Sequence, residues 1–297
     1  MGEYSKALSS HEKALESEQQ TLPSNHPDLA TSYCNIGLVY NNMGEYSKAL
    51  SSHEKALEIQ QKALPSNHPR LATLYSNIGG VYDNMGEYSK ALSSYEKALG
   101  IKQKALPSSH PHLATLYSNI GLVYNNMGEY SKALSSHEKA LEIYQKSHPS
   151  NHPSLATSYC NIGGVYYNMG EYSKALSSHE KALEIYQKAL PSNHPLLATS
   201  YGNIGCVYDN MGEYPKALSP YEKALEIYQK TLPSNHPRLA TLYNNIGCVY
   251  DNMGEYSKAL SFYEKALGIK QNALPPNHFD LATSYCNIGV QMHPKVD

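Results

Sequence analysis

The protein has 297 residues and a formal net charge of −2 at pH 7, and its aromatic residues comprise 27 Tyr, 2 Phe and no Trp. The 24 Lys and Arg do not exceed the 26 Asp and Glu, which argues against a nucleic-acid-binding surface, and five Cys are too few for a disulfide-stapled fold. The first twenty residues are polar and no apolar run approaches the ~20 residues that span a bilayer, so we expect a cytoplasmic protein that binds neither nucleic acid nor membrane.

A four-residue string, Met-Gly-Glu-Tyr, recurs every 42 residues, beginning at Met1, Met43, Met85, Met127, Met169, Met211 and Met253. Such a period predicts a single repeat array over residues 1–297 rather than two globular domains. The array divides into the second helix of a truncated repeat at 1–26, full repeats at 27–68, 69–110, 111–152, 153–194, 195–236 and 237–278, and a first helix with a divergent tail at 279–297.

Each unit reads as two antiparallel helices, and nothing in it reads as a strand. In the first unit, large residues follow one another at spacings of three and four, at Leu29, Tyr33, Ile36 and Tyr40. This spacing predicts a helix that ends at the turn around Gly44, and a similar pattern predicts a second helix from about Glu45 to Ala63. Pro69 opens the next unit at a helix start, while Pro220 lies inside a second helix and predicts a bend there.

These residues resemble a known repeat. The pattern Tyr33-x-x-Ile36-Gly37-x-x-Tyr40, followed by Gly44, Tyr46, Ala49, His53 and Ala56, resembles the tetratricopeptide repeat, whose usual unit has about 34 residues. About eight extra residues, with a His-Pro pair, make it similar to the kinesin light chain type. The resemblance implies an all-α, right-handed superhelical solenoid of antiparallel helix pairs. Gly37 and Ala49 are expected where two helix backbones come closest.

Most columns of the repeat are identical between copies, and the differences in the first helix concentrate in four columns, which begin at Ser32, Cys34, Leu38 and Asn41. The last three share one helix face. In the family this face lines a concave groove for extended peptides, although any solvent-facing column can also vary without function. The groove residues expected from these columns are Ser76, Ser118, Cys160, Leu122, Asp83, Asn125, Tyr167, Asp209 and Asp251.

One column on that face is always Asn. An amide both donates and accepts hydrogen bonds, so a row of amides could hold a peptide backbone independently of its sequence. The kinesin light chain type uses such residues in this way, which places the following in the groove: Asn35, Asn77, Asn119, Asn161, Asn203 and Asn245, beside Thr73, Thr115 and Thr157. The alternative is that these amides bridge to a neighbouring helix.

No pattern in the sequence indicates catalysis, a metal or a cofactor. Phosphate-binding loops, hydrolase elbows and kinase signatures do not occur. The His-Pro histidines lie one to a unit and cannot converge on a metal ion, while His53 and its equivalents occupy a packing column. Cys206 and Cys248 are too far apart to form a disulfide. The inner columns hold no cation, so we expect neither a carboxylate tail nor a strongly acidic motif as the ligand.

The sequence therefore predicts a non-enzymatic scaffold that binds an extended peptide or a partner helix in a concave groove. The alternative is a regulatory or sensor module of a larger enzyme or signalling protein whose catalytic domain lies outside this chain. The pattern starts and stops inside a unit, so we expect the chain to be a fragment of a longer protein. The identity of the partner does not follow from the sequence.

Overall fold

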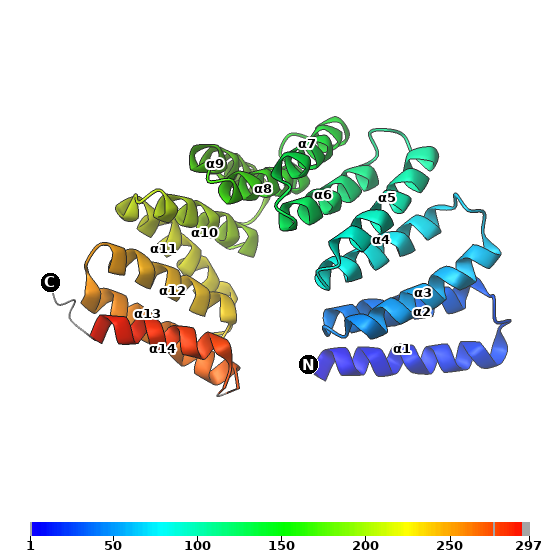
Figure 1. Ribbon diagram of the computed structural model, residues 1–297, viewed down its shortest axis with the longest axis horizontal. Coiled ribbons are helices and arrows are strands. Elements are labelled where there is room, and N and C mark those ends of the chain that lie inside the picture. Colours follow the sequence, from blue (N-terminus) through cyan, green and yellow to red (C-terminus); the bar gives the residue numbers. More distant parts are fainter. Residues whose placement is uncertain (1, 276, 293–297) are drawn as a thin grey trace. The chain divides into compact units, whose positions relative to one another are not determined.

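The computed structural model describes residues 2–275 and 277–292, and these residues form helices joined by short turns, with no strand among them (Figure 1). The predicted all-α class is confirmed. The helices are α1 (Gly2–Thr21), α2 (Pro27–Asn42), α3 (Tyr46–Ala63), α4 (Pro69–Asn84), α5 (Tyr88–Ala105), α6 (Pro111–Asn126), α7 (Tyr130–Ser147), α8 (Pro153–Asn168), α9 (Tyr172–Ala189), α10 (Pro195–Asn210), α11 (Tyr214–Thr231), α12 (Pro237–Asn252), α13 (Tyr256–Ala273) and α14 (Phe279–Met292).

The chain forms two compact units, Met1–His148 and Pro149–Asp297. Within each unit the first helix of a repeat packs mainly on the second helix of the same repeat, as α2 packs on α3 and α8 on α9. It also packs on the second helix of the preceding repeat, as α2 does on α1 and α10 on α9. This stacking leaves one side of each first helix free of a covering second helix, and that side carries the candidate site.

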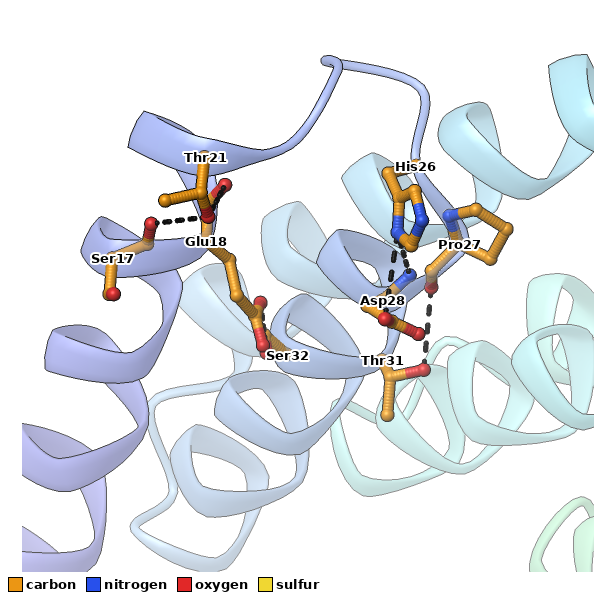
Figure 2. Close-up of polar contacts among 8 residues, drawn as sticks. All are labelled: Ser17, Glu18, Thr21, His26, Pro27, Asp28, Thr31 and Ser32. Atoms are coloured by element: carbon orange, nitrogen blue, oxygen red, sulfur yellow. Dashed lines mark hydrogen bonds and ion pairs between the residues drawn. The ribbon is translucent and has the colours of Figure 1, made fainter.

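Histidine caps the first helix of each repeat. Figure 2 shows the Nδ1 atom of His26 accepting a hydrogen bond from the backbone N–H of Asp28, at 3.3 Å. Pro27 occupies the first helical turn, where the missing N–H leaves no intrahelical bond unmade. The same bond, at 3.2 Å, is made by His68, His110, His152, His194, His236 and His278. The His-Pro pair therefore starts helices, a role that the sequence reading left unassigned.

A glycine turn joins the two helices of a pair. Gly44 has φ of 77°, a left-handed conformation that costs other residues energy because of their Cβ atom. Its N–H donates to the carbonyl of Asn41, and the next N–H, of Glu45, donates to the carbonyl of Tyr40. Equivalent glycines with φ of 73–77° close every described pair, so the turn is reproduced in each repeat.

The core of a helix pair is an aromatic ring seated on a glycine. Ala49 and Ala56 are fully buried, and His53 between them is also fully buried. A Cβ atom on Gly37 would lie 2.7 Å from the His53 ring. The glycine therefore makes room for an imidazole, and the expectation that two backbones come closest at Gly37 stays a prediction. In other repeats the ring is that of Tyr95, Tyr221 or Tyr263.

The conspicuous tyrosines line the helix faces with their hydroxyls at the edge of the core. Tyr33 is half-buried, and its hydroxyl accepts a hydrogen bond from Gln19 at 2.9 Å. The ammonium of Lys55 lies 5.5 Å from the centre of the Tyr33 ring, and Lys48 has the same relation to Tyr40. Tyrosine rings with polar edges thus take the place of Trp, which is absent, and of Phe, which is rare.

The proline inside α11 does not end the helix, which runs uninterrupted from Tyr214 to Thr231 through Pro220. Pro215 lies in the first turn, where proline is tolerated. In most other repeats the residue equivalent to Pro220 is a serine whose hydroxyl donates to the carbonyl four residues earlier, as Ser52 does to Lys48 at 2.9 Å, and in the repeat that follows α11 it is Phe262. The bend expected at Pro220 stays a prediction.

Candidate peptide-binding groove

The residues predicted to form a groove lie on the first helices of their repeats. Their Thr side chains are exposed and their Asn side chains are half-buried, so this face borders solvent. In the first unit they are Asn35 on α2, Thr73, Ser76, Asn77 and Asp83 on α4, and Thr115, Ser118, Asn119, Leu122 and Asn125 on α6. In the second unit they are Thr157, Cys160, Asn161 and Tyr167 on α8, Asn203 and Asp209 on α10, and Asn245 and Asp251 on α12.

A hollow of about 310 Å³ opens on this face between α10 and α12, and we call it the α10/α12 hollow. It brings two predicted amides, Asn203 and Asn245, to one site. A Cβ atom on Gly202 would meet nothing within 4 Å, so this glycine leaves the hollow open. The rest of the lining is Ala198, Thr199, Cys206, Tyr228, Arg238, Thr241 and Leu242.

Arg238 brings a positive charge to the groove, which the sequence reading missed. The columns considered there hold no cation, but Arg238 reaches the hollow from the first turn of α12. Its guanidinium lies 5.9 Å from the centre of the Tyr228 ring, and the structure contains no ion pair to it among the described residues. The Tyr228 hydroxyl in turn lies 3.0 Å from Thr199 Oγ1. An exposed guanidinium stacked on a ring is available to a carboxylate.

A second hollow, of about 200 Å³, opens between α8 and α10, and we call it the α8/α10 hollow. Asn203 and Cys206 line both hollows, so the two adjoin. The other lining residues are Cys160, Gly164 and Tyr167 from α8 and His179 from α9. Cys160 and Tyr167 are among the groove residues expected from the sequence, and Gly164 belongs to the variable column that begins at Leu38. His179 was not expected, because a core histidine gives no sign in the sequence of reaching the surface.

The column of identical asparagines divides into two groups. Three of them bridge to the preceding repeat: Asn77 Nδ2 donates to Cys34 Sγ at 3.3 Å, Asn245 Nδ2 to Cys206 Sγ at 3.8 Å, and Asn287 Nδ2 to Asn244 Oδ1 at 2.9 Å. The side-chain amides of Asn35, Asn119, Asn161 and Asn203 make no hydrogen bond within the described structure. The bridging alternative considered from the sequence thus has three examples, and the peptide-holding role of the other amides stays a prediction.

A second asparagine column, at the end of each first helix, holds the repeats together. Asn84 Nδ2 donates to Asn41 Oδ1 at 3.0 Å, Asn126 Nδ2 to Asp83 Oδ1 at 3.3 Å, and Asn210 Nδ2 to the Tyr167 hydroxyl at 2.7 Å. The acceptor column varies in residue type, but each of these acceptors supplies an oxygen. Asn41, Asp83 and Tyr167 are therefore partly engaged within the protein, a constraint that a list of variable columns does not reveal.

Second helices also reach this face through tyrosine hydroxyls. The hydroxyl of Tyr144 lies 3.2 Å from Thr115 Oγ1, and that of Tyr186 lies 2.8 Å from Thr157 Oγ1. These tyrosines replace the Gln60 or Lys102 of other repeats, and they orient the threonines beside the amide column. The sequence could have indicated this contribution of the second helices, because only certain repeats carry Tyr at this position.

Burial shifts the pKa values of several titratable groups of the groove toward their neutral forms. Burial raises the pKa of the Cys160 thiol to about 11, and burial likewise raises the pKa of Cys206 despite a hydrogen bond from the Tyr221 hydroxyl at 3.2 Å. Burial raises the pKa of Asp83 and Asp209, and a hydrogen bond from an asparagine opposes that shift in each. Protonated thiols are poor nucleophiles, so this face is suited to binding rather than to covalent chemistry.

No group of three or more His, Cys, Asp or Glu within the described part of the chain is arranged to hold a metal ion. The five cysteines are unpaired. Every helix among the described residues is too short or too polar to cross a bilayer.

The tetratricopeptide repeat family model matches residues 1–62, 28–104, 112–188, 161–230 and 210–272. The chain belongs to the tetratricopeptide repeat family. Repeats of this family generally mediate protein–protein interactions, and they are typically non-catalytic scaffolds. A comparison with curated protein sequences finds no match.

Three solved structures show what this tetratricopeptide repeat chain is similar to. A putative kinesin light chain of Podosopora anserina with nearly identical repeats is 26% identical, with 69% of this chain and 98% of that one covered and a TM-score of 0.59. BtubC (BKLC) from P. vanneervenii is 24% identical, with 76% and 91% covered and a TM-score of 0.65. The apo form of RapI is 19% identical, with 99% and 81% covered and a TM-score of 0.71. The last two show the fold alone.

Proposed function

We propose that this protein is a non-catalytic scaffold that holds an extended peptide segment of a partner protein along the inner face of its first helices. The observation that carries the proposal is the pair of unengaged amides, Asn161 and Asn203, in consecutive repeats of the second unit. A half-buried amide that makes no hydrogen bond within the protein can donate to a ligand and accept from it.

The spacing of the repeats suits a peptide backbone. Packed helices lie about 8–10 Å apart, which corresponds to roughly three residues of an extended chain. Each amide can donate to a peptide carbonyl and accept from a peptide N–H. Asn161 and Asn203 would then hold one short segment at two points without reading its side chains.

Side-chain preference would come from the charges that border the groove. The guanidinium of Arg238 stands at the start of α12, whereas Asp209 and Asp251 stand near the ends of α10 and α12. An acidic side chain of the partner can pair with Arg238, which makes no ion pair in the described structure. This modifies the expectation that the ligand carries neither a carboxylate tail nor a strongly acidic motif, because Arg238 at one end of the helices favours an acidic side chain.

The test is selection of binders from a random peptide library by immobilised protein, followed by affinity measurement on purified variants. We expect Asn161→Ala combined with Asn203→Ala to weaken binding at least about tenfold, because each lost neutral hydrogen bond contributes ~0.5–1.5 kcal/mol. Asn193→Ala, in an exposed loop of the same unit, is the matched control and should bind as the wild type does. A library that yields no binder, or binders indifferent to the double substitution, would refute the proposal.

We also propose that the scaffold works in the cytoplasm, and the unpaired state of its five cysteines agrees with that location.

The variant Arg238→Gln tests the charge preference separately. Peptides with an acidic residue should lose affinity for this variant, and peptides without one should not. Equal losses for both classes would contradict the assignment of Arg238.

A further inference from the structure

Two columns of the repeat contact each other across a helix pair, and their residues are matched in size. One column is on the first helix (Leu38 and its equivalents) and the other is the ring column of the second helix (His53 and its equivalents). Where the ring is a tyrosine, the partner is a small residue at the hydroxyl: Tyr221 donates to Cys206 Sγ at 3.2 Å, and Tyr263 donates to Cys248 Sγ at 3.4 Å.

Where the ring is a histidine, two repeats supply a leucine. Leu38 is paired with His53 and Leu122 with His137. Both rings are at most 1% exposed, and both of their nitrogens are enclosed. A long ring thus meets a short partner, and a short ring meets a long one.

One repeat breaks this rule, because it has both the short ring and the short partner, His179 and Gly164. A Cβ atom on Gly164 would meet nothing within 4 Å, whereas one on Gly80 would lie 3.5 Å from the Tyr95 hydroxyl. The α8/α10 hollow of about 200 Å³ is the result, and both residues line it. A cavity of ~150 Å³ is enough to bind benzene, so this hollow has room for an aromatic side chain.

A buried and unpartnered side chain borders the hollow. His179 is 3% exposed and makes no hydrogen bond in the described structure. The Nδ1 atom of His179 is enclosed, as both ring nitrogens of His53 and His137 are. The Nε2 atom of His179 is not enclosed and remains accessible from the hollow. A buried polar group with one accessible edge favours a ligand that completes its hydrogen bond.

The other polar groups around the hollow are uncharged. Cys160 and Cys206 present thiols, and Asn203 presents a free amide. The Tyr167 hydroxyl accepts a hydrogen bond from Asn210 and keeps its own proton to donate. Besides burial, the nearby Asp209 raises the pKa values of Cys206 and Tyr167, so a negatively charged side chain would be repelled here and would lose its hydration.

We propose that the α8/α10 hollow is a specificity pocket for a tyrosine side chain of the bound peptide, whose hydroxyl hydrogen-bonds to His179. The proposal rests on the peptide-binding function proposed above, of which it names one determinant. The repeats that carry Tyr95, Tyr221 and Tyr263 fill the matching position with the phenol of their own tyrosine, which shows that this packing environment accepts a phenol. Gly164 opens the same position to a phenol from outside.

The chain itself supplies the variants that close the pocket. Gly164→Leu reproduces the pair Leu122 and His137, and His179→Tyr reproduces the pair Gly80 and Tyr95. Both pairs pack in other repeats of this protein, so both variants should keep the fold, which circular dichroism verifies. Gly100→Leu is a control, because a Cβ atom at Gly100 also meets nothing within 4 Å. Gly100 is in α5 of the first unit and is not part of the proposed pocket.

The direct experiment uses p-cresol, the tyrosine side chain as a free molecule, with toluene as the analogue that lacks the hydroxyl. Imidazole resonances are followed by NMR, and the signal of His179 is assigned as the one lost in His179→Tyr. We expect p-cresol to shift this signal in the wild type and in Gly100→Leu but not in Gly164→Leu. Toluene should bind about tenfold more weakly, because it makes no hydrogen bond.

Equal binding of toluene and p-cresol, no shift of the His179 signal, or an unchanged shift in Gly164→Leu would overturn the proposal. The result is separable from that of the peptide selection. If p-cresol binds as expected while no peptide is selected, the pocket stands and the proposed function fails. If peptides are selected but their tyrosine can be replaced by alanine without loss, the groove stands and the pocket is refuted.

Discussion

Acid should destabilise this protein through its buried ring column. His137 is 1% exposed, both ring nitrogens are enclosed without a hydrogen bond, and burial lowers its pKa from the ordinary 6.5 to about 4. Between these two values the unfolded chain binds a proton that the folded chain does not. The free energy of unfolding therefore falls as the pH falls from 6.5 to 4, and it is unaffected by this group above 6.5.

The magnitude follows from the size of the shift. At 1.36 kcal/mol per pKa unit, His137 lowers the free energy of unfolding by about 3 kcal/mol at pH 4, and by about 1.3 kcal/mol between about pH 7.5 and pH 5.5. His53 and His179 have pKa values lowered to about 4 by the same cause and add similar amounts.

The assay is urea unfolding followed by circular dichroism at about pH 7.5 and pH 5.5. The comparison variant combines Leu122→Cys with His137→Tyr, which copies the pair Cys206 and Tyr221 and removes the titrating ring without removing the packing. We expect the wild type to lose about 1.3 kcal/mol more than the variant between the two pH values. Equal losses would refute the reasoning, since every other histidine is shared by the two proteins.

Three further predictions follow from the packing, the caps and the thiols. Gly205→Ala should lower the free energy of unfolding by ~1–3 kcal/mol, because its Cβ atom would lie 2.6 Å from a tyrosine ring. Gly100→Ala, in open space inside a helix, should raise the free energy of unfolding by ~0.5–1 kcal/mol. Urea unfolding of both variants checks the contrast. His68→Ala removes a helix cap and should cost ~0.5–2 kcal/mol in the same measurement, with no loss contradicting the cap. At mildly alkaline pH, iodoacetamide should modify exposed Cys286 well before Cys160, whose pKa is raised to about 11, and mass spectrometry of the peptides gives the order.

The fold could be predicted because every repeat has the same spacing of large residues and the same turn glycine. The spacing of Leu29, Tyr33, Ile36 and Tyr40 defines one helix face, and Gly44 marks the turn, so the helix bounds in the structure follow closely. Roles that depend on atomic detail could not be read in this way. The pattern shows a histidine before a proline, but only the distance from His26 Nδ1 to a backbone N–H reveals a helix cap.

The sequence indicated which repeat positions lie on the face of the candidate site, but it did not indicate which residues contact one another there. Variation between copies identified the face that carries Cys160, Tyr167 and Asp209, and the structure brings the first two to one hollow. Arg238 was missed because it belongs to a column at the helix start, one turn before the columns considered. The bond from Asn210 to Tyr167 was missed because the two residues are 43 positions apart, and the register between neighbouring repeats is a property of the packing.

Near-identical repeats restrict where an individual site can arise. A contact that recurs in every unit, such as the histidine cap, cannot distinguish one repeat from the next. A change in one column usually comes with a change in the column it touches, as Cys206 accompanies Tyr221 and Leu122 accompanies His137. Where two contacting columns change out of step, the shared packing leaves space, and Gly164 opposite His179 is such a place. In an array of this kind, a mismatched pair is therefore a source of specificity in addition to a single variable residue such as Gly202.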